Sequence, residues 1–451
     1  MQNLLGENAI VIGGGIAGLL AARVLFTHFK QVTIVEKDIY SNKAGPRNGI
    51  PQSSHIHILL MKGKQILTEL FPNLEFNLIS KGAHKVDLLA DVKYHLATGV
   101  AMRFKSGMYT IACTRPLLEY AIRNELLAQS QNIKIINNAR VINLIKNLAE
   151  NKIVGVNALS NNVTQDFYGE LIVDAGGRNS ETIQWLEKIG FGRPNEIRIN
   201  SFIGYATRKY KFPDNLNLDW KSLIVLTNPP TNPRMAVIYP VEDNSIMVGL
   251  LGIGKTYPPT DAEGFLEFAK QIGIDEVKKT IENSEPISSI FGYRERGSRK
   301  YLFEKMKRWP ENFITLGDSA CAFNPIYGQG ISVAAMCAKT LGECLKSDGK
   351  IKTLEKNFAK KFQKRIATVN SFPWLLGTSE DLRWPTSQGP RPNLVTKLMQ
   401  KYVNEVMLMG PQSAIATRSF FMVLHMLKSP IVLFHPRVIL DLANKKLVKR
   451  N

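Results

Sequence analysis

The chain is poor in cysteine: its 451 residues include four, with no C-x-x-C pair and no zinc-ligand spacing. This pattern argues against a disulfide-stapled secreted scaffold and against a structural zinc module, and we expect no metal site. Long apolar runs are also missing, because no stretch of ~18 uninterrupted apolar residues occurs, so we expect no membrane-spanning helix. No Lys or Arg precedes Arg23, and glycines break the first apolar run. We therefore expect no secretory signal and a cytoplasmic location.

Acidic residues are in deficit, with 38 Asp+Glu against 58 Lys+Arg and a formal net charge of +20. Such an excess fits nucleic acid, an anionic membrane surface or an anionic cofactor, or simply a Lys-rich solvated surface. No zinc-finger, RNP or helix-turn-helix signature accompanies the charge, so we expect no nucleic-acid partner. The composition is 44% apolar and 21% charged, which supplies a buried core and excludes wholesale disorder.

A glycine turn stands between the first predicted strand, residues 8–12, and a run of helix formers at 19–25. Gly13 permits the tight turn, Gly15 lets backbone approach a pyrophosphate, and Gly18 permits close packing of helix on sheet. Ile16 and Ala17 open the helix, whose free N–H groups and positive dipole end favour phosphate. A β-branched run follows at 31–35, and a β-α-β unit of this kind requires a parallel sheet.

The second strand of this unit ends in an acid. Glu36 stands about twenty residues after the glycines, where a carboxylate accepts from a ribose hydroxyl and disfavours a 2′-phosphate. Lys37 follows it directly. The turn and the acid together predict a bound dinucleotide.

A second signature lies far along the chain: Gly317-Asp318-Ser319-Ala320, then Asn324-Pro325-Ile326-Tyr327-Gly328-Gln329-Gly330. The combination of both motifs resembles the FAD-dependent monooxygenases of the para-hydroxybenzoate hydroxylase type (group A). The resemblance implies FAD as cofactor, with Asp318 on the ribityl chain. It also implies a loop and helix start beside the flavin ring, formed by Pro325, Gly328, Gln329, Gly330 and Ile331. Reduced flavin carries negative charge, which a helix N-terminus there would stabilise.

Further positions extend the resemblance. Arg47 lies in the loop after the second strand, and Arg115 starts a helix that Thr114 caps; both positions contact FAD phosphate or ribityl groups in the family. Within this family, the sequence most resembles the polyether-type polyketide epoxidases. The segments that carry this resemblance are 47–52, 55–60, 174–180, 204–208 and 381–385.

The chain departs from the wider family at one place. Asp174 is expected to serve FAD and nicotinamide binding, but Ala175 follows it instead of Gly, and Ile183 stands where an Arg is expected. NAD(P)H remains the expected electron donor, with a partner flavin reductase as the other source.

The resemblance implies an α/β fold: an FAD-binding Rossmann-like (GR2-type) domain, an inserted antiparallel-sheet substrate domain and a C-terminal helical region. We predict the FAD-binding domain at 1–85, 111–180 and 300–346, the substrate domain at 86–110 and 181–299, and the helical region at 347–451. Glu242-Asp243-Asn244 predicts a hairpin inside the substrate domain.

The implied activity is monooxygenation: one atom of dioxygen enters an apolar unsaturated or aromatic precursor through a C4a-hydroperoxyflavin, as epoxidation or hydroxylation, in secondary metabolism. Alkene epoxidation requires no protein base, and the candidate catalytic residues are only His55 and His57, which packing also explains. A flavin-dependent reductase of isoprenoid double bonds and a flavin halogenase are the alternatives, although no W-x-W-x-x-I motif is present. A further alternative is that the chain is a non-catalytic basic binding protein.

The C-terminal region is rich in Met and Phe, which suits a long apolar ligand as well as an ordinary core. The apolar run 419–440, followed by basic residues at 445, 446, 449 and 450, leaves peripheral membrane contact open.

Overall fold

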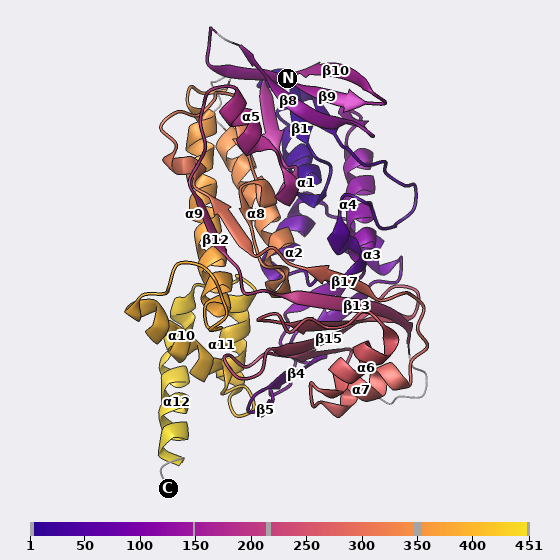
Figure 1. Ribbon diagram of the computed structural model, residues 1–451, viewed down its shortest axis with the longest axis vertical. Coiled ribbons are helices and arrows are strands. Elements are labelled where there is room, and N and C mark those ends of the chain that lie inside the picture. Colours follow the sequence, from indigo (N-terminus) through magenta and orange to yellow (C-terminus); the bar gives the residue numbers. More distant parts are fainter. Residues whose placement is uncertain (1–3, 148, 213–217, 347–353, 449–451) are drawn as a thin grey trace.

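A computed structural model describes residues 4–147, 149–212, 218–346 and 354–448 of the chain. The side chains of 445–448 and residues 449–451 lie outside this description, so the basic side chains at 445, 446, 449 and 450, for which the sequence leaves membrane contact open, are not described. The strand at 6–12 lies in the upper part of the view and the helix at 436–448 at its lower end (Figure 1). Within the described ranges, no helix combines the length and the apolar character needed to cross a bilayer.

A parallel sheet forms the centre, with strand order β19-β11-β1-β2-β7. Its strands are short, apolar and mostly buried on both faces, as parallel strands covered by other layers must be. They are β1 (Gly6–Ile12), β2 (Phe29–Val35), β7 (Ile133–Ile136), β11 (Leu171–Asp174) and β19 (Phe313–Thr315). Ile12 pairs with Val35 and with Asp174, and Asp174 pairs with Thr315, so the carboxyl ends of four strands meet along one edge.

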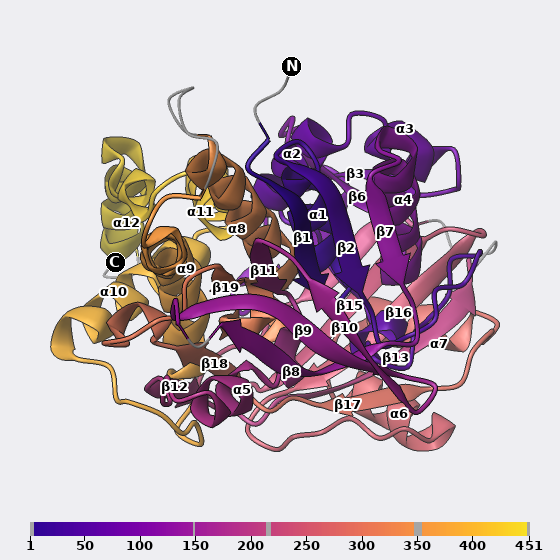
Figure 2. The ribbon, with the colours of Figure 1, turned by 90° about the horizontal axis from the view of Figure 1, so that it is seen from above.

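Helices cover one face of this sheet and a second, antiparallel sheet covers the other (Figure 2). The helix α1 packs against both α4 and α8, while β9 and β10 contact β11 and β1. The covering helices are α1 (Ile16–Leu25), α4 (Arg115–Gln129) and α8 (Gln329–Leu345), with α2 (Met61–Leu70), α3 (Leu74–Ile79) and α9 (Phe358–Asp381) around them. The second sheet comprises β8 (Arg140–Asn147), β9 (Lys152–Ser160) and β10 (Val163–Tyr168), and α5 (Thr182–Lys188) follows β11.

A larger sheet stands below, in the order β17-β13-β16-β15-β14-β4-β5 (Figure 1). All its pairs are antiparallel except β4 with β14. Its strands are β4 (Val92–Leu96), β5 (Gly99–Val100), β13 (Gly204–Lys211), β14 (Ser222–Val225), β15 (Arg234–Val241), β16 (Ser245–Gly252) and β17 (Phe291–Arg294). The predicted hairpin is confirmed, because β15 and β16 pair from Val241↔Ser245 to Arg234↔Gly252.

The two faces of this sheet have different neighbours. Ala236 and Ile238 pack under α6 (Ala262–Lys270) and α7 (Asp275–Glu282), whereas Met235 and Val237 point the other way, toward Phe421 of the C-terminal helices. The period of two in β15 therefore divides its side chains between a core and a second face that borders a cavity.

The remaining elements connect these layers. The small sheets are β3 (His84–Asp87) with β6 (Tyr109–Ala112), and β12 (Glu196–Ile199) with β18 (Ser298–Tyr301) and β20 (Cys321–Ala322). The C-terminal helices are α10 (Leu394–Met407), α11 (Ala414–Leu424) and α12 (Pro436–Val448). The single-turn helices are η1 (Pro51–Ser54), η2 (Gly177–Asn179), η3 (Phe303–Lys305), η4 (Gly317–Ser319), η5 (Pro325–Tyr327) and η6 (Pro430–Phe434).

The predicted fold class is confirmed: a parallel α/β core, antiparallel sheets and C-terminal helices. Local predictions also hold at α4, where the Thr114 side chain accepts from the Leu117 amide, and at α8. The spacing of apolar residues from Ile56 to Leu70 predicts a helix, but this prediction is wrong for the first turn: α2 begins only at Met61, and Ile56, His57, Ile58 and Leu60 line a cavity. The predicted domain boundaries stay predictions.

Candidate functional site

The glycine turn at 13–15 connects the carboxyl end of β1 to the start of α1. Gly13 has φ +91°, a conformation that side chains with Cβ rarely adopt, and a Cβ on Gly18 would lie 1.9 Å from the Gly13 carbonyl oxygen. A Cβ on Gly15 would instead meet no atom within 4 Å, because it faces a cavity of about 590 Å³. No side chain caps α1. Its first amides therefore face open space, which is the arrangement that binds phosphate.

The acid after β2 is held from several sides. Glu36 accepts from the Gly14 amide at 2.5 Å and from the Asp38 amide at 2.8 Å, and Arg47 lies 3.4 Å away. Arg47 also pairs with Glu119 at 2.6 Å. These contacts fix Glu36 and Arg47 in the cavity wall; Lys37 lines the same cavity.

Asp174 is fully buried at the carboxyl end of β11. It accepts from Ser180 Oγ and Thr182 Oγ1, both at 2.5 Å, and from the Gly176 amide at 2.8 Å. Burial raises the pKa of Asp174 despite these hydrogen bonds. Both oxygens are thus engaged within the turn toward α5, although the residue still borders the first cavity.

A second cavity, of about 310 Å³, lies between the large sheet and the C-terminal helices. Its walls are mainly apolar and come from β14, β15 and β16 on one side and from α10, α11 and η6 on the other. Residues 55–58 and Leu60 form a third wall. A mainly apolar cavity with a few polar groups is the usual form of a small-molecule site.

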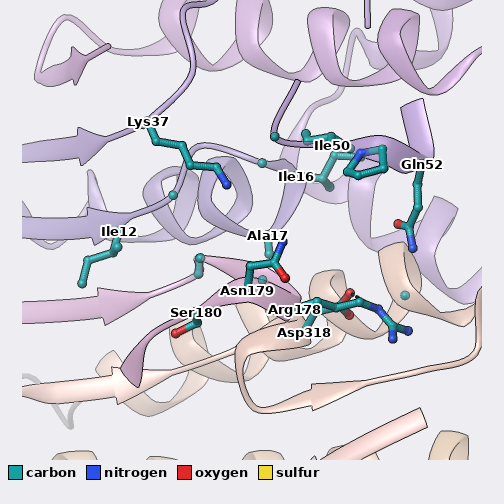
Figure 3. Close-up of a pocket in the computed structure, with 18 of the residues that line it drawn as sticks. Ile12, Ile16, Ala17, Lys37, Ile50, Gln52, Arg178, Asn179, Ser180 and Asp318 are labelled. Carbon is teal, nitrogen blue, oxygen red and sulfur yellow. Dashed lines mark ion pairs between the residues drawn. The ribbon is translucent and has the colours of Figure 1, made fainter. Parts of the chain in front are cut away.

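The two cavities meet at a shared wall. Six residues line both of them: Gln52, Arg115, Arg178, Asp318, Gly330 and Ile331. Because Gly330 and Ile331 belong to the first turn of α8, the positive end of that helix faces the junction. Figure 3 shows Arg178 and Asp318 on the side of the first cavity away from Lys37 and Ile50.

The junction is charged and tightly organised. Arg178 pairs with Glu295 at 2.6 Å and lies 3.5 Å from Asp318, and it donates to the carbonyls of Gly297 and Phe323. Burial raises the pKa of Glu295. Arg115 donates to Gln52 at 3.2 Å.

The structure brings most of the predicted cofactor residues to these two spaces. The first cavity is lined by Gly13, Gly15, Ile16, Ala17, Glu36, Lys37, Arg47, Arg115, Asp174, Asp318, Gly330 and Ile331. The second is lined by His55, His57, Pro325 and Gly328, besides the shared residues. Gly18 and Gln329 line neither: Gly18 packs on the turn, and Gln329 is buried.

The two histidines have different surroundings. His55 Nδ1 lies 2.9 Å from Thr207 Oγ1, and the ring meets Tyr205 edge-on at 4.6 Å. Burial lowers the pKa of His55 to about 4. Burial and the nearby Arg115 charge lower the pKa of His57 to about 3. Both imidazoles are therefore neutral at pH 7, able to exchange hydrogen bonds but not to act as charged acids.

Several buried polar atoms around the junction have no hydrogen-bond partner among the described residues. They include Arg115 Nε, Arg299 Nε and His57 Nδ1. Buried polar groups are rarely left unpaired, so these atoms indicate a bound group that offers acceptor oxygens or nitrogens.

A buried polar cluster supports the loop at 325–328, which lines the second cavity. Asp381, at the end of α9, accepts from Ser201 Oγ and Asn324 Nδ2, both at 2.8 Å, and from Tyr327 OH at 3.0 Å. Burial raises the pKa of Asp381 to about 6. The Asn324 side chain in turn caps η5 through the Ile326 amide, so the cluster fixes the segment that leads into α8.

Sequence reasoning missed Arg178, Glu295 and Asp381 as site residues. Arg178 follows Gly176-Gly177 directly after a predicted strand, and this position could have been a signal. Glu295 has no local signal, because its partner stands 117 residues earlier.

No protein-family model matches the chain. Protein Rv3254 of Mycobacterium tuberculosis is 26% identical over 388 residues, which span 83% of this chain and 80% of that protein.

Solved structures share the fold at low identity. A triple mutant of the flavin-dependent brominase Bmp2 superposes with a TM-score of 0.63 at 16% identity, covering 98% of this chain and 99% of that one. PqsL of Pseudomonas aeruginosa, described as a probable FAD-dependent monooxygenase, superposes with a TM-score of 0.60 at 17% identity, covering 84% and 97%. The chain therefore has the fold of these proteins along most of its length.

Proposed function

We propose that the chain is a flavin-dependent monooxygenase that binds FAD across the first cavity and an apolar substrate in the second. The observation that carries the proposal is the junction: one polar cavity at a glycine turn meets one apolar cavity at the first turn of α8. The structural neighbours support it, since PqsL and Bmp2 are described as FAD- or flavin-dependent.

The residues of the first cavity fit an elongated anionic cofactor. The uncapped start of α1 and the open space at Gly15 suit a pyrophosphate, and Glu36 suits a ribose. The unpartnered Nε atoms of Arg115 and Arg299 supply cationic donors toward the junction. Arg47 and Lys37 add positive charge to the wall.

When bound, FAD would supply the redox chemistry, taking electrons from NAD(P)H or from a partner reductase and activating dioxygen. The chain's own residues do the rest. Arg115, Arg178 and the N-terminus of α8 stabilise negative charge at the junction. The helices α10 and α11 with η6 cover the second cavity and exclude water from it.

The substrate follows from the lining of the second cavity. Its walls offer apolar and aromatic side chains such as Tyr94, Ile224, Met235 and Phe421, so we propose an unsaturated or aromatic apolar precursor that is epoxidised or hydroxylated in secondary metabolism. The neutral His55 and His57 orient the substrate by hydrogen bonding; neither is needed as a base for an alkene. More specifically, we propose that the chain is an epoxidase of the polyether type.

A halogenase is the second candidate, because the brominase fold covers nearly the whole chain. The absence of a W-x-W-x-x-I motif weighs against it.

Turnover under ¹⁸O-labelled dioxygen, with bromide and chloride present and mass spectrometry of the product, separates the candidates. One labelled oxygen atom supports monooxygenation. A halogenated product supports the halogenase, and a hydrogenated, unlabelled product supports a reductase of isoprenoid double bonds. Purified protein that stays without a 450 nm flavin band after reconstitution with FAD contradicts all three and leaves a non-catalytic binding protein.

A further inference from the structure

The C-terminal elements expose large apolar side chains that soluble surfaces usually bury. Leu394 and Leu398 of α10 are 71% and 60% exposed, and Ile431 of η6 is 79% exposed. Other large exposed side chains lie in α10, η6 and α12: Val395, Phe434, Ile439 and Leu440. We call these seven residues the C-terminal apolar face. Scattered exposed apolar residues are normal, but a concentration of this kind marks an interaction surface.

The face is continuous across two elements. Leu394, Leu398 and Tyr402 stand at four-residue intervals and so share one side of α10. The Tyr402 ring stacks on Phe434 at 4.5 Å, with 3° between the planes, and Tyr402 OH donates to the Leu433 carbonyl at 2.6 Å. The apolar stripe of α10 therefore runs directly into η6, and α12 contacts both elements.

The same region is strongly cationic. Residues 386–440 contain six Lys or Arg and a single acid, Glu405. All six cations are exposed, and within the described parts of the chain none has an acidic partner within 4.0 Å; they are Arg391, Lys397, Lys401, Arg418, Lys428 and Arg437. Unpaired cations in the same C-terminal region as exposed apolar side chains match the two components of an anionic lipid surface.

The inner sides of these elements line the second cavity. Val403 and Met407 of α10 and Pro430 and Leu433 of η6 are cavity residues, while Leu398 and Ile431 of the same elements face outward. A single layer of chain thus separates the proposed apolar substrate from the C-terminal apolar face.

We propose that the C-terminal apolar face docks on an anionic lipid surface, at which the second cavity takes up its apolar substrate. The docking rests on exposure and charge alone, whereas the uptake rests on the proposed function. A second copy of the chain is a poorer occupant, because a symmetric contact would oppose two sets of six unpaired cations. Nucleic acid would leave the exposed leucines and Ile431 in water.

The test is co-sedimentation of the flavin-loaded full chain with vesicles of phosphatidylcholine alone or mixed with phosphatidylglycerol. We expect binding to the mixed vesicles, weaker binding to the neutral ones, and release at high salt. The variants K397Q/K401Q and L398S/I431S should each weaken binding by about tenfold or more, through loss of charge and of apolar insertion respectively.

The matched control is F76S/K134Q, which removes an exposed Phe of α3 and an exposed Lys of β7. The views of Figures 1 and 2 place α3 on the other side of the molecule from α10 and α12. The control should bind vesicles as the wild type does. Equal unfolding temperatures and flavin contents establish that all variants are folded.

Wild-type protein that stays in the supernatant with anionic vesicles at low salt would overturn the proposal. So would K397Q/K401Q and L398S/I431S variants that bind as tightly as the control. A wild-type dimer in analytical ultracentrifugation that L398S/I431S converts to monomer would assign the face to self-association instead. None of these readouts uses turnover. Vesicle binding can therefore fail while labelled oxygen still enters the substrate, and vesicle binding can occur in a protein that incorporates no labelled oxygen.

Discussion

Arg178 and Glu295 form a 2.6 Å ion pair at the junction of the two cavities, with side chains 17% and 1% exposed. Arg178 comes from the turn after β11, and Glu295 follows β17 in the large antiparallel sheet. The same guanidinium lies 3.5 Å from Asp318. One side chain therefore ties the parallel core, the large sheet and the loop before α8 at the place where cofactor and substrate would meet.

Removing Arg178 should be costly because it leaves Glu295 buried without its partner. We expect R178M to lower the free energy of unfolding by about 3–5 kcal/mol at pH 8, and R178M/E295L to recover part of that loss. The unpaired carboxyl can take up a proton, so R178M should lose less at pH 5. Urea unfolding at both pH values measures these effects. A loss below about 1 kcal/mol at pH 8 would contradict a structural role for the pair.

Gly15 offers a substitution that separates cofactor binding from folding. A Cβ there meets no atom within 4 Å and the residue has φ −67°, so G15A should fold normally while its methyl group occupies the phosphate cradle. We expect FAD to bind about tenfold more weakly or worse, as measured by calorimetric titration. Gly45 also has open space around it, and G45A is the matched control. Equal FAD affinity in both variants would place the cofactor elsewhere.

Buried histidines should make the protein acid-sensitive. Burial lowers the pKa of His55 and of His425 to about 4, and that of His57 to about 3, from 6.5. Below pH 6.5 the unfolded chain binds protons that the folded chain does not, so stability falls as pH falls from about 6.5 to 4. Each histidine adds a slope of about 1.4 kcal/mol per pH unit inside this window.

The measurement is urea unfolding of wild type and H425Q between pH 4.5 and 7.5. The Met61 amide donates to His425 Nδ1 at 3.2 Å, and the Gln side-chain oxygen can still accept this hydrogen bond while the substitution removes one titrating group. As pH falls, we expect the free energy of unfolding to decrease less steeply in H425Q than in the wild type. In H435Q, whose substituted side chain is exposed, we expect the same decrease as in the wild type. Parallel curves for H425Q and wild type would show that His425 titrates alike in both states.

The pH dependence of stability that comes from Asp381 should have the opposite sign to that from the buried histidines. Burial raises its pKa from 3.8 to about 6, so its contribution to stability is greatest at low pH and is lost as pH rises through about 6. D381N keeps an acceptor for Ser201, Asn324 and Tyr327, and we expect its free energy of unfolding at pH 7.5 to equal or exceed that of the wild type.

D381A removes that acceptor and should cost at least about 2 kcal/mol, because three buried donors lose their partner. Chemical unfolding of both variants at pH 7.5 measures the contrast. Equal losses in D381N and D381A would show that the buried charge itself is required.

The glycine turn and the start of α4 could be predicted because their causes are local. Gly13 needs a positive φ, Gly18 must lack a Cβ, and Thr114 caps α4 by accepting from the Leu117 amide three residues on. The prediction of a helix over residues 56–60 was wrong because Ile56, Ile58 and Leu60 are apolar for a different reason: they line a cavity, and periodicity does not distinguish a cavity wall from a helix face.

The sequence by itself determined the β-α-β core, the hairpin at 242–244 and the excess of cations, since each depends on neighbours within a few residues or on composition alone. Only the tertiary structure decided that Arg178 meets Glu295, that Asp381 holds Asn324, and that two cavities share one wall. Such contacts join segments tens to more than a hundred residues apart, and packing of whole layers brings them together. Nothing in a local pattern specifies which distant side chain will be the partner.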